Sequence, residues 1–144
     1  MLIEAVQNGH ELGNHGYYDH AHALISEDDL IKEIDHTDCI IRSIYRKAKI
    51  NLPNQLYFRP GSGFITFSME RIIKSLSYKI ALGSVYPHDT LITNYLINCW
   101  YLINRIKSGD IVILHDRPNT QKVLQKVLPY LIEKKHHFQT LNHE

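Results

Sequence analysis

Cysteine, unbalanced charge and long apolar runs are scarce in this sequence, and each shortage excludes a class of protein. Only two cysteines occur in 144 residues. Cys39 and Cys99 stand far apart in apolar stretches, which favours buried free thiols over a disulfide. Sixteen basic residues face fifteen acidic ones, for a formal net charge of +1, and no long run of like charge occurs. We therefore expect neither a nucleic acid nor an anionic membrane surface as a partner.

No apolar run approaches the roughly 20 residues of a membrane-spanning helix. The first residues, MLIEAVQNGHEL, lack the basic start and apolar middle of a secretion signal. Neither observation identifies a compartment, so the localisation stays open. Because the chain is 44% hydrophobic and has the length of one globular domain, we predict a single domain over residues 1–144.

A helix over about residues 27–47 is the clearest local feature. Ser26 followed by Asp29 has the form of a capping box, in which the serine hydroxyl accepts a backbone N–H of the first helical turn. Apolar residues then recur at helical spacing, namely Leu30, Ile34, Ile41 and Tyr45.

The rest of the chain alternates strand-like and helix-like segments. Strands are predicted in QLYFRPGSG, YKIALGS and GDIVILHD, the last of them buried. Helices are predicted in MERIIKSLS, TNYLINCWYLINRIK and TQKVLQKVLPYLIEKK, the last of which Pro129 can kink. Since strands separated by helices pair in parallel, the pattern predicts an α/β fold.

Histidine is concentrated in the stretch GHELGNHGYYDHAH, residues 9–22. This stretch holds His10, His15, His20 and His22 together with Glu11 and Asp19. A solvated loop does not need so many imidazoles, whereas imidazole and carboxylate groups are common ligands of zinc and similar divalent ions. The stretch therefore indicates a metal site.

Polar residues also follow the predicted strands, where the loops of a parallel sheet converge. They are His15, Arg59, His88, Asp89, His115 and Asp116. Taken singly, each has a structural interpretation: His88 as an exposed loop residue, Asp116 as a cap, Arg59 as an ion-pair partner. Taken together they predict one cleft, in which the side chains of His15, Arg59, Asp89 and His115 meet.

Four of these motifs carry a resemblance to a known family. GHELGNH, FRPGSG, YPHD and IVILHD occur in the order seen in the polysaccharide deacetylase family, also called the NodB homology domain or carbohydrate esterase family 4. The resemblance implies a distorted (β/α) barrel. It also implies hydrolysis of N-acetyl or O-acetyl groups from chitin oligomers, peptidoglycan or related sugars with a divalent metal.

The resemblance implies metal ligands in the histidine-rich stretch. His15 matches the family's first metal-binding histidine, and the second usually follows four positions later. Asp19 stands at that position and His20 one further on. Either Asp19 is an oxygen ligand or the loop shifts so that His20 reaches the metal, and both are reasonable for zinc, with cobalt or nickel as alternatives.

The resemblance also implies catalytic and substrate-binding residues. Arg59 matches the arginine that braces the catalytic base, and Ser62 stands where a backbone N–H helps to hold the oxyanion. Asp89 matches the aspartate that tunes the general acid, and His115 matches that acid. Leu114 matches the pocket residue that accepts the acetyl methyl group.

One family motif has no match. An Asp-Asp pair in a TFDDG-like segment supplies the family's catalytic base and one metal ligand, and no such segment occurs here. The only such dipeptide, Asp28-Asp29, stands in the first turn of the predicted helix, where acidic residues favour the helix dipole. We therefore expect an incomplete barrel that lacks the first one or two strands. Alone, this chain should bind a divalent metal weakly and show no appreciable turnover.

Three functions stay open at this point. The first is a metal-dependent deacetylase of acetylated carbohydrate whose missing part lies upstream or in another chain. The second is a catalytically inactive remnant that only binds carbohydrate or metal. The third is a domain in which His15, His20 and His22 hold zinc for stability. The oligomeric state is not predicted.

Overall fold

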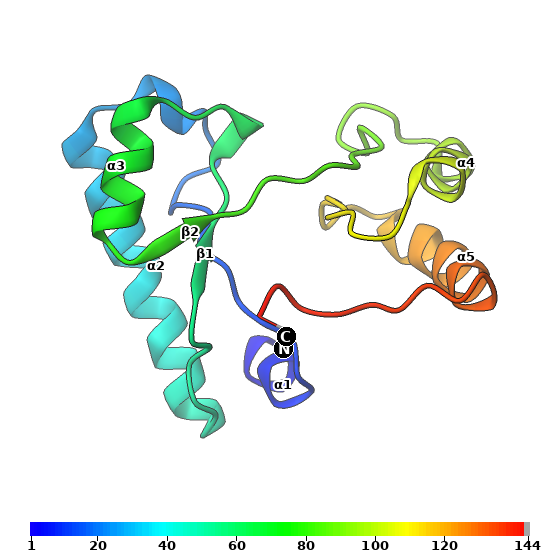
Figure 1. Ribbon diagram of the computed structural model, residues 1–144, viewed down its shortest axis with the longest axis horizontal. Coiled ribbons are helices and arrows are strands. Elements are labelled where there is room, and N and C mark those ends of the chain that lie inside the picture. Colours follow the sequence, from blue (N-terminus) through cyan, green and yellow to red (C-terminus); the bar gives the residue numbers. More distant parts are fainter. Residues whose placement is uncertain (143–144) are drawn as a thin grey trace. The chain divides into compact units, whose positions relative to one another are not determined.

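The computed structural model describes residues 1–142. These residues form two compact units, the first of residues 1–82 with 140–142 and the second of Gly83–Gln139. The first unit contains α1 (Leu2–Gln7), α2 (Glu27–Ala48), β1 (Leu56–Phe58), α3 (Phe67–Ser75) and β2 (Tyr78–Ile80), with short 3-10 turns at His22–Leu24 and Gly61–Gly63. The second contains α4 (Tyr95–Arg105) and α5 (Thr120–Glu133) (Figure 1). Among residues 1–142, no helix is both long and apolar enough to cross a membrane.

The long helix α2 begins where the sequence predicts it. The Ser26 hydroxyl accepts the Asp29 backbone N–H at 3.1 Å and donates to the Asp29 carboxylate at 2.7 Å. The helix ends one residue later than predicted, and Lys49 closes it in a left-handed conformation with φ of 59°. Asp28 and Asp29 lie in the first turn, as expected for acidic residues that favour the helix dipole.

The strands of the first unit pair in parallel. Residues of β1 and β2 are in register from Leu56 opposite Tyr78 to Phe58 opposite Ile80. Asn14 forms an isolated parallel bridge with Phe58 on the other side of β1. Because both pairings are parallel, the residues that follow Asn14, Phe58 and Ile80 leave at the same edge. The predicted α/β fold with parallel strands is confirmed.

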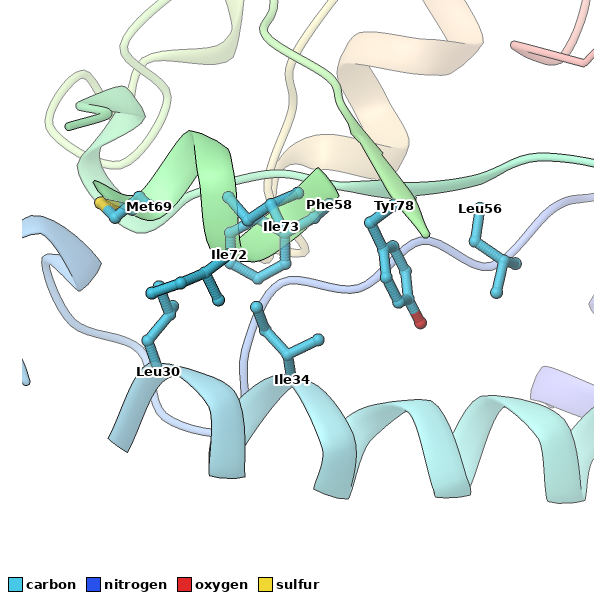
Figure 2. Packing of buried hydrophobic residues seen from close by; sticks show 8 residues of the cluster. All are labelled: Leu30, Ile34, Leu56, Phe58, Met69, Ile72, Ile73 and Tyr78. Carbon is cyan, nitrogen blue, oxygen red and sulfur yellow. The ribbon is translucent and has the colours of Figure 1, made fainter. Parts of the chain in front are cut away.

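A buried apolar core holds this edge in place. The core cluster lies between α2, α3 and the two strands, and Figure 2 shows Leu30 and Ile34 of α2 pointing toward the side chains of α3. Its members are Leu30, Ile34, Leu56, Phe58, Met69, Ile72, Ile73 and Tyr78. Full burial of each such side chain contributes roughly 1.5–3 kcal/mol before the entropy cost of ordering it. The core therefore fixes the position of the loops that follow the strands.

The second unit is a pair of packed helices. Helices α4 and α5 contribute Cys99, Leu102, Val123, Val127 and Leu131 to a buried cluster that also includes Val85. Both helices were predicted from their apolar spacing, and α5 continues through Pro129 to Glu133.

The prediction of a buried strand in GDIVILHD is wrong. Only Val112 pairs there, in an isolated parallel bridge with Val85, and Ile111 and Val112 are each 37% exposed. A buried parallel strand needs hydrogen-bonding neighbours and two covered faces. Within its unit, the segment has one bridging partner, and Pro87, which lacks an N–H, follows that partner closely.

The prediction of two buried thiols is half right. Both cysteines are free, and Cys99 is buried, whereas Cys39 is exposed. Burial raises the pKa of the Cys99 thiol. Cys39 is five residues after the buried Ile34, which is about 140° further around the helix, so it faces away from the core. The apolar neighbours of Cys39 in the sequence therefore suggested burial of a thiol that the helix turns toward solvent.

Candidate active site

His15 is positioned by the strand edge. Its neighbour Asn14 is buried, accepts the Arg59 backbone N–H at 2.9 Å with its carbonyl oxygen, and donates from its side chain to the Ile34 carbonyl at 2.9 Å. The Nδ1 atom of His15 is hydrogen-bonded to the Arg59 carbonyl oxygen. Since a carbonyl oxygen only accepts, Nδ1 carries the proton and the lone pair lies on Nε2. This is the arrangement usual for a histidine that binds a metal through Nε2.

A buried carboxylate from α2 lies beside the histidine-rich loop. The Oε2 atom of Glu33 accepts the backbone N–H groups of Tyr17 and Tyr18, each at 3.1 Å. Its Oε1 atom lies 2.9 Å from Nε2 of His20. Sequence reasoning missed Glu33. The available signal was its place next to Ile34 and three residues after Leu30, on the apolar face of the predicted helix.

His22 is the most deeply buried of these imidazoles, with 1% of the residue exposed. Its Nδ1 accepts the Gly61 backbone N–H at 2.7 Å, and its ring stands edge-on to Phe58 at 5.5 Å. Its Nε2 lies 3.6 Å from Oε2 of Glu33 and makes no hydrogen bond to a described residue. Burial is the main cause that lowers the pKa of His22, against the opposing effect of Glu33. The lowered pKa favours the neutral form of His22.

Two glycines make room for His22. A Cβ on Gly16, whose φ is +78°, would lie 2.1 Å from Nε2 of His22. A Cβ on Gly61 would lie 1.9 Å from the His20 carbonyl oxygen and 2.8 Å from Nδ1 of His22. A side chain at position 16 would displace the His22 imidazole, and one at position 61 would displace the His20 backbone as well, so the local packing requires glycine at both.

The metal-ligating atoms of this loop and of Glu33 on α2 fit a divalent metal. Ligand atoms of His20, His22 and Glu33 all lie within 4.8 Å of one another. The Nε2 atoms of His20 and His22 are buried without a hydrogen bond of good geometry to any described residue, and such atoms call for a partner. Two imidazoles and a carboxylate form a common donor set for zinc. This group does not include His15 or the exposed Asp19.

The second unit contains a histidine–carboxylate pair. Asp89 is buried, and its Oδ2 accepts the His115 backbone N–H at 2.7 Å. Its Oδ1 lies 2.9 Å from Nδ1 of His115. The Tyr86 ring lies 5.5 Å from that imidazole. The side chain of His115 is partly exposed, so the pair can exchange protons with a bound molecule.

The other predicted residues lie near these groups in their own units. Ser62 is exposed in the turn after β1, with a φ of 62° that places it in the left-handed region. Leu114 is partly buried and packs against the cluster of the second unit. His88 and Asp116 are exposed. The structure thus joins the His15 ring with the Arg59 backbone and the Asp89 side chain with His115, and the single cleft of all four side chains stays a prediction.

Comparison with known families gives a match in the first unit. The family model described as polysaccharide deacetylase matches residues 1–81, which is more than half of the chain. A peptidoglycan-N-acetylglucosamine deacetylase from Bacillus cereus is 29% identical over 148 residues, which cover 99% of this chain and 66% of that protein.

Solved structures share the fold. A mutant of the peptidoglycan deacetylase PdaC from Bacillus subtilis matches with a TM-score of 0.84 at 21% identity, over 97% of this chain and 65% of that one. A CE4 family pseudoenzyme from Bacillus anthracis matches with a TM-score of 0.79 at 20% identity, over 94% of this chain and 46% of that one. The chain thus spans from under half to about two thirds of these proteins.

Proposed function

The chain belongs to the polysaccharide deacetylase family, and we propose that it serves metal-dependent hydrolysis of acetyl groups on carbohydrate. The substrates would be N-acetyl groups of chitin oligomers, peptidoglycan or related sugars. The observation that carries this proposal is the pairing of Asp89 with His115. This pair lies outside residues 1–81, so it supports the function independently of the family match.

Each residue has a role that its surroundings allow. Asp89 accepts the Nδ1 proton of His115, which leaves Nε2 to carry and release the proton that the departing amine needs. Histidine is the side chain that most often carries out such a proton transfer. Leu114 would contact the acetyl methyl group.

In the first unit, His15 would bind the metal together with Asp19 or His20. Zinc is the expected ion, with cobalt or nickel as alternatives. A bound divalent ion supplies polarisation of the acetyl carbonyl and a more acidic water. The backbone N–H of Ser62 would stabilise the oxyanion, and Arg59 would brace the group that accepts the water's proton.

A second candidate is a catalytically inactive protein that binds carbohydrate. It is favoured by one specific observation, the absence of an FDDG segment from the 144 residues. No carboxylate in the recognised motifs matches the family's base, and general base catalysis is worth about 10² to 10⁴-fold. We therefore propose that the chain alone binds metal without appreciable acetate release.

Acetate release from acetylated chitin oligomers and from peptidoglycan, with added zinc or cobalt, tests these proposals. The samples are this chain, a form extended through any FDDG segment encoded upstream, and both with His115→Ala. Release by the extended form that His115→Ala abolishes supports the deacetylase. Sugar binding without release in every sample overturns it in favour of the inactive protein. Release by the short chain alone would overturn the absence of a base, with Asp19, Asp89 and Asp116 the first to examine.

A further inference from the structure

The two imidazoles beside Glu33 cannot serve a metal in the same way, because a backbone N–H fixes the ring proton of His22. An amide N–H only donates, so Nδ1 of His22 accepts from Gly61 and the His22 proton lies on Nε2. Metal binding at that Nε2 would require moving the proton to Nδ1 and breaking the 2.7 Å bond to Gly61. His22 is close enough to belong to the donor group, but its hydrogen bond with Gly61 excludes it as a metal ligand.

Glu33 is held with one oxygen engaged and the other directed at His20. Oε2 accepts two backbone N–H groups of the histidine-rich loop, from Tyr17 and Tyr18. Oε1 lies 2.9 Å from Nε2 of His20, yet this contact lacks hydrogen-bond geometry. Two donor atoms so close, one from a buried carboxylate and one a buried ring nitrogen without a hydrogen bond to a described residue, are arranged like two ligands of one cation.

We propose that His20 and Glu33 bind a divalent metal ion together, through Nε2 and Oε1, and that His22 is a positioning residue. The Tyr17 and Tyr18 N–H groups orient the carboxylate, and the buried Nε2 of His22 packs 3.6 Å from its Oε2 without a hydrogen bond. The family resemblance assigns no role to Glu33 or His22.

This assignment rests on the metal dependence proposed above and changes its ligand set. His15 lies outside the donor group, so the assignment provides one histidine and one carboxylate, both of them ligand types found in zinc sites. Glu33 would thereby supply a carboxylate to a chain that has no FDDG segment. Asp19, which is exposed, is not needed as a ligand.

Zinc titration calorimetry on the full chain tests the role of Glu33. The test variant is Glu33→Gln, which keeps an oxygen for the Tyr17 and Tyr18 N–H groups. The control is Asp35→Asn, which removes an equal charge from an exposed position on the same helix. We expect Glu33→Gln to weaken zinc binding about 10-fold or more and Asp35→Asn to leave it unchanged. Equal affinities for the wild type and Glu33→Gln would overturn the assignment.

Long-range ¹H–¹⁵N NMR of the wild-type imidazoles needs no variant and so covers the case in which Glu33→Gln does not fold. On addition of zinc, we expect the Nε2 resonance of His20 to shift while Nε2 of His22 keeps its proton. A metal-bound Nε2 on His22 would overturn the proposal. Zinc binding as expected without acetate release would leave this assignment intact and count only against the deacetylase.

Discussion

Asp89 contacts both the backbone and the ring of His115: one carboxylate oxygen accepts the backbone N–H at 2.7 Å and the other lies 2.9 Å from Nδ1. One buried side chain therefore fixes the position and the orientation of the imidazole. The two residues are 26 positions apart in the sequence. A mutation of Asp89 should accordingly change stability as well as chemistry.

Asp89→Ala should destabilise the chain by about 1–3 kcal/mol. The substitution leaves the His115 backbone N–H and the ring without their acceptor, and a polar group that loses its partner away from water costs about that amount. Urea unfolding followed by circular dichroism measures the change. Asp116→Ala, at an exposed position, is the control, and equal stability of the two variants would contradict the prediction.

Gly16→Ala should cost more than Gly9→Ala. Both glycines have positive φ, +78° and +85°, so both substitutions incur backbone strain of order 1–3 kcal/mol. Only at position 16 would the new Cβ also clash, at 2.1 Å from Nε2 of His22. Thermal unfolding and zinc titration should show the larger loss of stability and of affinity in Gly16→Ala, and similar values would count against the described packing.

Tyr78 should make the chain lose stability at alkaline pH. Burial, with a hydrogen bond donated to Asp38 at 2.6 Å, raises the pKa of the Tyr78 phenol in the folded chain. The folded state thus holds the proton more tightly than the unfolded chain, whose pKa is about 10. The stability due to this difference is complete below pH 10 and is lost as the pH rises above it.

Urea unfolding between about pH 8 and 11 measures this effect. Tyr78→Phe should flatten the alkaline decline, while the exposed Tyr18→Phe should leave it as in the wild type. An equally steep decline in Tyr78→Phe would assign the alkaline sensitivity to another group.

Ser26→Ala should cost about 1 kcal/mol, the usual value of an N-cap. The hydroxyl accepts the Asp29 backbone N–H and also lowers the pKa of the Asp29 carboxyl. Denaturant midpoints compared with Ser108→Ala, an exposed serine outside the helices, give the difference. No difference between the two variants would show that the cap is not needed.

The sequence by itself determined the features that depend on near neighbours. The cap at Ser26 and the apolar spacing of Leu30, Ile34 and Ile41 act within a few residues, so the limits of α2 were predicted to within one residue. The alternation of helices with strands predicted parallel pairing, and motif order predicted the family. The GDIVILHD segment shows the limit, since its apolar pattern cannot supply the neighbouring strand that pairing requires.

Only the tertiary structure decided which nitrogen of each imidazole holds a proton and which carboxylate lies beside them. The Nδ1 partner of His22 is 39 positions away in the sequence and that of His15 is 44 positions away. One partner is a donor and the other an acceptor, so two similar histidines of one loop have opposite tautomers. Glu33 reaches the loop because α2 packs against the strand edge, and no local pattern encodes that contact.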